Sequence, residues 1–333
     1  MDLIPYAFCE AVFVLLSMDK SNCEVIAKQL RGVWKRAAEK YAENVYIFTT
    51  GIWRDDGGQW WYNIWDHAQC QKGPASLDDL LRMDRRFVRF MRVTPGTGSI
   101  SDEPAISISK QDLVNKYIPF LNLQSQRSTI FDLTDIAEHD TAVEYLKLFK
   151  EYTAFGFLTL SYYGVESENF LAAQIKNNSF LYTVGYKGCW PRSERIEDLS
   201  IEILRKPSIT ELCLPRDEED NQLTMKVIKA TFDLWWLSGR RVDVSGSVDE
   251  TEVDVLSIPL PPDVTRSEKY EKRGLREKLT VRWSKETVPD FTCVIFVGES
   301  VSLNSRYYGG EMENVCQDGE FQCWDDDSEC HLL

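Results

Sequence analysis

Residues 1–43 place their apolar side chains at the three- and four-residue intervals of amphipathic helices. Pro5 suits the first position of a helix, and Phe8 and Val12 follow it on one face. A second apolar stripe runs over residues 21–41, with Lys and Arg side chains on the opposite face. The pattern predicts two helices that form one small module.

Beyond this module the period changes to that of strands. Residues 45–53 and 59–65 are rich in β-branched and aromatic side chains, and residues 54–58 between them read Arg-Asp-Asp-Gly-Gly, which predicts a β-hairpin. Its large aromatic side chains either pack in the core, which we favour, or offer a stacking surface to a sugar or a peptide. They are Trp53, Trp60, Trp61, Tyr62 and Trp65.

A short helix and another strand complete the connector that we expect over residues 44–105. Ser76, followed by two Asp, predicts the start of the helix, and residues 86–93 favour a strand before the Pro-Gly-Thr-Gly loop at 95–98. Acidic residues near this segment balance its positive charge, which favours a solvated face over a nucleic-acid site. The residues that raise the alternative are five arginines that interleave with aromatic residues, as in some nucleic-acid binders. They are Arg82, Arg85, Arg86, Arg89 and Arg92.

Short apolar strands recur from residue 106 to about residue 300. Each has a small or polar residue between two large ones, and the segments between the strands have helical patterns. The strand cores are Phe131–Leu133, Leu158–Leu160, Tyr182–Val184, Leu212–Leu214 and Val242–Val244. Their first members are 27, 24, 30 and 30 residues apart, and two of the strands extend to the spacing of leucine-rich repeats.

The pattern therefore predicts an α/β protein in which a helical module and a β-hairpin precede an open stack of strand–helix repeats over residues 106–300. The alternative is a closed, doubly wound sheet, whose strands are buried on both faces and read as nearly continuous apolar runs. The middle residues of the strand cores favour a face open to water instead. They are Asp132, Thr159, Thr183, Cys213 and Asp243.

The C-terminal part of the chain is expected to cap the stack and then to end in a tail. Residues 265–276 have the composition of a charged helix, and residues 278–284 and 291–297 favour strands. Residues 301–333 are acidic and without periodicity, so we expect disorder there.

Composition and charge exclude several classes of protein. The 333 residues are 43% hydrophobic, which excludes a wholly disordered chain. Lys and Arg number 38 against 53 Asp and Glu, giving a net charge of −15, so we expect neither a nucleic-acid nor a membrane partner. The nine cysteines and the lack of an export signal favour reduced thiols in the cytoplasm or nucleus.

The sequence offers few groups for catalysis or for metal binding. The three histidines, His67, His139 and His331, have no metal-binding spacing, and Cys316, Cys323 and Cys330 are too far apart for a typical metal site. We therefore expect no metal or cofactor. Cys189 and Arg195 have the separation of a cysteine-dependent phosphatase loop, but Pro191 removes an amide donor and Glu194 adds negative charge.

The N-terminal residues resemble a degenerate F-box, the helical module that docks onto a Skp1-type adaptor of ubiquitin ligases. Ile4-Pro5 stands at its Leu-Pro position, Phe8 and Val12 lie in its first helix, and Trp34 follows at its tryptophan position. The resemblance implies that Ile4, Pro5, Phe8, Val12 and Trp34 bind the adaptor.

The whole arrangement is similar in layout to the expanded F-box-associated families of nematodes, whose C-terminal domains are presumed to recruit targets. The resemblance implies a non-enzymatic substrate receptor that binds a target protein through the five middle residues. The alternatives are a repeat-type interaction scaffold without ligase function and the Cys189 phosphatase.

Overall fold

The computed structural model describes residues 4–16, 20–66, 76–96, 105–134, 136, 138–215, 223–246, 253–273, 276–286, 288–297 and 300–304. Its helices are α1 (Tyr6–Leu16), α2 (Lys20–Gln29), α3 (Gly32–Asn44), α4 (Leu77–Arg82), α5 (Lys110–Asp112), the π-helical η1 (Leu113–Tyr117), α6 (Ile118–Gln124), α7 (His139–Leu148), α8 (Val165–Asn177), α9 (Glu194–Arg205), α10 (Met225–Ser238) and the 3-10 turn η2 (Val255–Ser257). Disorder was expected for the acidic segment 301–333, but residues 301–304 form part of a strand, because their backbone pairs with neighbouring strands, and residues 305–333 lie outside the described residues.

The described strands form one mixed sheet of thirteen strands. They are β1 (Tyr46–Arg54), β2 (Trp60–Asp66), β3 (Val88–Pro95), β4 (Ile106–Ile108), β5 (Ser125–Leu133), β6 (Phe157–Ser161), β7 (Thr183–Lys187), β8 (Glu211–Cys213), β9 (Asp243–Gly246), β10 (Thr265–Arg273), β11 (Arg276–Lys285), β12 (Val288–Val297) and β13 (Ser300–Asn304). Their order across the sheet is β10-β11-β12-β13-β9-β8-β7-β6-β5-β3-β1-β2-β4. The expected α/β class is therefore confirmed.

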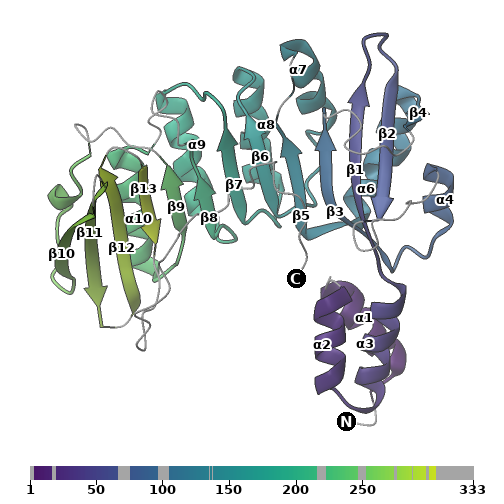
Figure 1. Ribbon diagram of the computed structural model, residues 1–333, viewed down its shortest axis with the longest axis horizontal. Coiled ribbons are helices and arrows are strands. Elements are labelled where there is room, and N and C mark those ends of the chain that lie inside the picture. The colour runs from purple at the N-terminus through teal and green to yellow at the C-terminus, as the bar shows by residue number, and fades with distance from the viewer. Residues whose placement is uncertain are drawn as a thin grey trace.

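The central strands β1, β3 and β5 to β9 are all parallel and follow one another in chain order. Figure 1 shows helices α7 to α10 side by side along one face of this sheet. Strands β10 to β13 extend the sheet at one end in antiparallel pairs, and β2 and β4 extend it at the other end.

Side chains of β6 to β9 alternate between fully and partly buried, as expected for strands covered by helices on one face only. One buried row crosses five strands: Phe131, Leu158, Val184, Leu212 and Val244 are mutual register partners. We call the opposite side of the sheet the open face.

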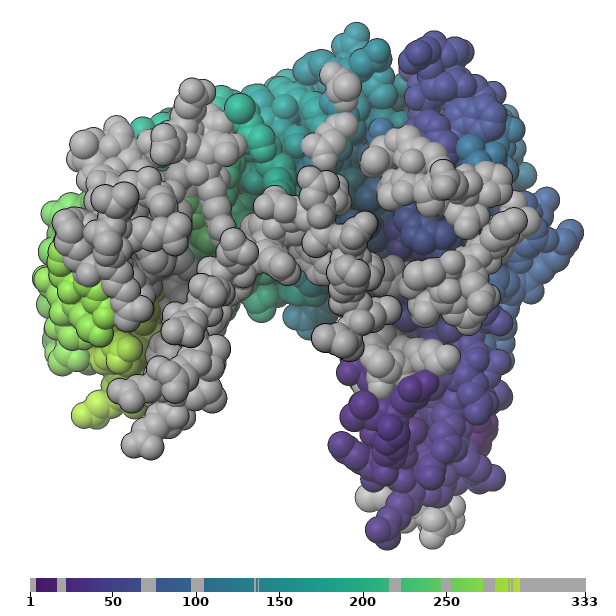
Figure 2. Space-filling model, in the orientation of Figure 1, coloured from purple at the N-terminus to yellow at the C-terminus, as the bar shows by residue number. Residues whose placement is uncertain are grey.

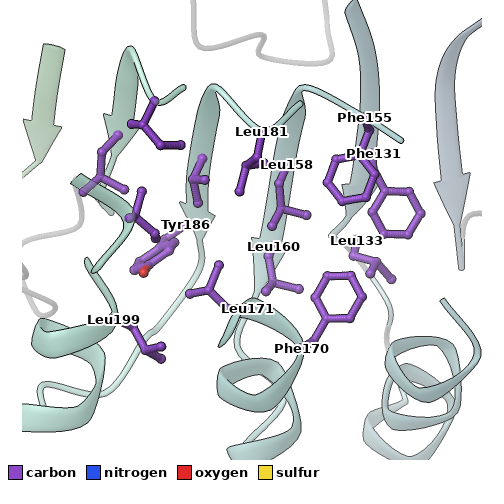
Figure 3. Packing of buried hydrophobic residues seen from close by; sticks show 14 of the residues in the cluster. Phe131, Leu133, Phe155, Leu158, Leu160, Phe170, Leu171, Leu181, Tyr186 and Leu199 are labelled. Atoms are coloured by element: carbon purple, nitrogen blue, oxygen red, sulfur yellow. The ribbon is translucent and has the colours of Figure 1, made fainter. Parts of the chain in front are cut away.

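The core is densest where aromatic side chains meet under β5 and β6. The ring of Phe131 lies 4.9 Å from that of Phe155, 5.0 Å from that of Tyr152 and 5.3 Å from that of Phe149, measured between centroids. Figure 3 shows this cluster continuing through Leu158 and further side chains of the parallel strands. The same core extends from the first hairpin to β12, so the expected connector over residues 44–105 and the expected repeat stack over residues 106–300 share it.

Local sequence signals explain where several helices begin. Ser76, Ser193 and Thr224 each stand just before a helix, and each side-chain oxygen accepts a hydrogen bond from the backbone N–H three residues further on. Such capping satisfies one of the amide groups that the first helical turn leaves without a partner. The short helix expected after Ser76 is thereby confirmed as α4.

The N-terminal module contains three helices instead of the expected two. The apolar stripe over residues 21–41 is divided between α2 and α3, which are separated at Leu30 and Arg31. Gly32 begins α3 with φ of 61°, in the left-handed region that favours glycine, so the helix cannot run straight through. The three helices enclose a small core of their own around Cys9, Phe13 and Tyr41.

Two further sequence expectations are wrong. Residues 265–273 form strand β10, not a helix, because their backbone pairs with β11. Helix-favouring charged residues are also suited to an outermost strand, where they discourage further pairing. The third strand was expected to place Tyr182 and Val184 in the core, but its buried side chains are Val184 and Tyr186. Tyr182 precedes β7 instead, and its ring centroid lies 4.4 Å from that of Phe157.

We expect Phe131→Ala to lower the free energy of unfolding by about 3 to 5 kcal/mol, because it leaves a cavity among four aromatic rings. Urea denaturation followed by circular dichroism measures the change. Phe180→Ala is the control, because Phe180 is exposed, and it should cost far less. Equal losses in the two variants would contradict this description of the core.

Candidate functional site

The five middle residues of the repeat strands lie on the open face in two neighbouring rows. Asp132, Thr159 and Cys213 belong to one row, together with Gly185 and Ser245. The other row consists of Ile130, Phe157, Thr183, Glu211 and Asp243. All ten residues are partly buried, and none of the described helices covers this face, whereas helices cover both faces of a doubly wound sheet.

Carboxylates give these two rows a negative character. Glu211 accepts hydrogen bonds from the hydroxyl of Thr183 at 3.3 Å and from the thiol of Cys213 at 3.6 Å. Asp132 accepts a hydrogen bond from Thr134 at 2.8 Å. The ten positions include Asp132, Glu211 and Asp243 but neither Lys nor Arg. The middle of the open face therefore suits a partner that is neutral or positively charged there.

The hairpin aromatics divide between the two faces of the sheet. Trp60 and Tyr62 are buried in the core, where Trp60 packs edge-on against Tyr145 of α7. The alternation of β1 and β2 places Trp53, Trp61 and Trp65 on the open face, and all three are only partly buried. Core packing therefore accounts for two of the five aromatic residues, and the other three remain candidates for a stacking surface.

Helix α1 carries apolar side chains on two faces. Cys9 and Phe13 pack in the core of the module. The other face consists of Phe8, Val12, Leu15 and Leu16, which follow one another at helical spacing. We call this second set, together with Trp34, the module patch.

Side chains of the module patch are exposed to an unusual degree. The exposed fraction is 54% for Phe8, 57% for Leu16 and 80% for Leu15. The ring of Phe8 lies 6.2 Å from that of Trp34, which is partly buried. Of the residues expected to bind an adaptor, Phe8 lies against Trp34 and Val12 follows Phe8 by one helical turn, whereas Ile4 and Trp34 also pack against the core of the module. The sequence pattern did not identify the exposure of Leu15 and Leu16, because their helical spacing equally suits a buried stripe.

Arg89 joins the module to the sheet. This residue of β3 is buried, and its guanidinium donates hydrogen bonds to the backbone oxygens of Val88 at 2.6 Å and Val14 of α1 at 3.1 Å. Figure 2 shows the module, in purple, projecting from the sheet as a separate lobe.

The arginine cluster is divided among local partners. Arg82 pairs with Asp79, and Arg86 pairs with Asp84, whose pKa is lowered by the hydrogen bond from Arg86. Arg82, Arg85 and Arg86 are exposed, as expected for a solvated face, but Arg89 is buried and Arg92 is partly buried, so the expectation is wrong for Arg89.

Two cavities in the described part of the chain have polar and charged linings. One cavity of about 390 Å³ is lined by side chains of α3, β1 and the α4–β3 segment, including Lys40, Tyr46 and Arg86. Another of about 200 Å³ is lined by Arg54, Lys110 and others, and both of these cations pair with Glu144. Neither cavity contains Cys189 or Arg195, the residues of the phosphatase alternative.

Cys189 and Arg195 are both exposed, Cys189 in the loop before α9 and Arg195 in the first turn of that helix. The described residues contain no group of three or more His, Cys, Asp or Glu side chains that could hold a metal ion. His67 and the tail cysteines Cys316, Cys323 and Cys330, with His331, lie outside the described residues. None of the helices in the described ranges has the length and hydropathy needed to cross a bilayer.

Comparison of the chain with known protein families, with curated proteins and with solved structures finds no match.

The division of the hairpin aromatics predicts unequal effects of two neighbouring substitutions. Trp60→Ala should lower the free energy of unfolding by about 3 to 5 kcal/mol, because Trp60 is buried in the core. Trp65→Ala should cost no more than about 2 kcal/mol, because Trp65 lies on the open face. Chemical denaturation measures both values, and a greater cost for Trp65→Ala would contradict the assignment of faces.

Proposed function

We propose that the protein is a non-enzymatic, F-box-like substrate receptor. In this proposal the N-terminal helices dock onto a Skp1-type adaptor, and the open face of the sheet, built from leucine-rich-repeat-like units, binds a target protein. The observation that carries the proposal is the second apolar face of α1, which the module does not bury in its own core.

The physical argument for docking starts from the cost of exposed apolar surface. Burying a Leu or Phe side chain is worth about 1.5 to 3 kcal/mol, so a helix that leaves several of them exposed is suited to a partner that covers them. An apolar helical face of this kind fits into a groove through residues at helical spacing, as Phe8, Val12, Leu15 and Leu16 are. Trp34 next to Phe8 supplies the kind of large aromatic anchor that contributes most to binding.

The open face suits a second, independent interaction. Its two rows cross five strands and combine the apolar Ile130 and Phe157 with the carboxylates of Asp132, Glu211 and Asp243. Because the open face and the module patch lie on different parts of the molecule, one chain could hold an adaptor and a target at the same time.

Co-purification with a Skp1-type adaptor tests the docking surface. The wild-type chain should retain the adaptor, and Leu15→Glu should weaken retention at least about tenfold, because it places a charge in the apolar contact. Leu237→Glu is the matched control, since Leu237 of α10 is 74% exposed but lies outside the module. Equal binding by both variants would contradict the role of the module patch.

The second candidate is an interaction scaffold that binds a target through the open face without binding an adaptor. The partly buried rows on the open face support it, because they do not depend on the module. The same co-purification separates the two functions, since a scaffold of this kind retains no adaptor even as the wild-type chain.

A simple assay tests the enzyme alternative. We expect the chain to release no product from p-nitrophenyl phosphate, because Pro191 and the exposed setting of Cys189 give no closed phosphate cradle. Turnover that disappears in Cys189→Ser would overturn this expectation.

A further inference from the structure

A group of hydrogen-bond donors lies at the hairpin end of the open face. Thr49 of β1 stands opposite Arg92 of β3 on one side and opposite Trp65 of β2 on the other. Asn63 lies two residues from Trp65 on the same face, opposite Gly51, which has no side chain. We call Thr49, Asn63, Arg92 and the three open-face tryptophans the hairpin site.

Three polar groups of the hairpin site, on Thr49, Asn63 and Arg92, lack acceptors within the described residues, whereas the indole of Trp61 donates to Asp55 Oδ2 at 2.8 Å. Asn63 is 1% exposed, and its Oδ1 accepts the N–H of Gly51 at 3.0 Å, but its Nδ2 donates to nothing. The hydroxyl of Thr49, which is 3% exposed, also has no partner. Arg92 is partly buried and makes no hydrogen bond or ion pair within these ranges. Arg92 is the most accessible of these three groups, so the site suits an occupant that brings oxygen acceptors to its guanidinium.

The chemistry of the site favours a carboxylate next to an aromatic ring. A guanidinium binds a carboxylate by paired, charge-assisted hydrogen bonds. Trp53, Trp61 and Trp65 surround these groups with partly buried indole rings, which pack well against other aromatic side chains. A neutral sugar fits less well, because its hydroxyl groups require hydrogen-bond acceptors from the protein as well as donors. The side-chain oxygen of Asn63 already accepts a hydrogen bond from the N–H of Gly51.

The chain itself contains a segment of this composition. Residues 320–327 read Glu-Phe-Gln-Cys-Trp-Asp-Asp-Asp, in which carboxylates flank Phe321 and Trp324. This segment follows β13 by fifteen residues, 305–319, which lie outside the described part of the chain.

The segment is long enough to reach the hairpin site. Seven strand spacings separate β13 from β1 in the sheet, a distance of about 34 Å at the usual spacing between strands. Fifteen extended residues span up to about 50 Å. The carboxylates in the middle of the open face repel an acidic segment, whereas Arg92 attracts it.

We propose that residues 320–327 bind intramolecularly to the hairpin site, with a carboxylate on Arg92 and the aromatic rings of Phe321 and Trp324 against the open-face tryptophans. This inference does not depend on adaptor binding. It gives the chain an internal ligand at one end of the surface that the proposed function assigns to a target.

Photo-crosslinking in the full-length chain tests the proposal. Benzoyl-phenylalanine at position 53 replaces an open-face tryptophan with another aromatic group, and mass spectrometry identifies the residues that it captures. We expect capture of residues 320–327 within one chain, and a yield about tenfold lower in Arg92→Gln because the charged contact is lost. Arg127→Gln is the matched control, since Arg127 of β5 stacks on Tyr182 away from the site, and it should leave the yield unchanged.

Hydrogen exchange on the chain without the crosslinker provides a second measurement. The amides of residues 320–327 should be protected in the wild-type chain and should exchange about tenfold faster in Arg92→Gln. Capture between two chains would assign the site to a second copy and overturn the proposal. It would also be overturned by exchange of these amides at the unprotected rate in the wild-type chain, or by equal crosslinking in Arg92→Gln.

Discussion

One-sided burial of the parallel strands is the constraint on which the rest of the structure depends. Side chains of a strand alternate between two faces, so the helices on one side require a continuous apolar row beneath them. Phe131, Leu158, Val184, Leu212 and Val244 supply that row across five strands. The residues between them are freed from packing and lie on the open face. The same alternation therefore builds the core and the candidate interaction surface.

The hairpin extends this principle to aromatic side chains. Trp60 and Tyr62 complete the core at one end of the sheet, while the alternate positions carry indole rings to the open face. Next to them, Arg92, Thr49 and Asn63 form a set of donors whose acceptors are absent from the described residues. Polar groups near the core of a stable protein are normally satisfied, and Arg92, the most accessible of the three, is the group on which the proposed internal ligand depends.

The N-terminal module follows a different rule. Its small core around Cys9 and Phe13 uses only one face of α1, and a second apolar face remains in contact with water. Arg89 connects this module to the sheet through the backbone of Val14. Two surfaces of different chemistry, one apolar and one partly acidic, are thus presented by one chain.

The sequence by itself determined the change of period at the first hairpin and the succession of strands and helices, because both follow from local spacing. The same spacing placed five residues on the open face: Asp132, Thr159, Thr183, Cys213 and Asp243. It could not determine that residues 265–273 pair as an edge strand, since that depends on contacts with β11. It could not decide which apolar stripe of α1 is buried either. Helical spacing describes a face of a helix, whereas only the neighbouring helices determine whether that face is covered.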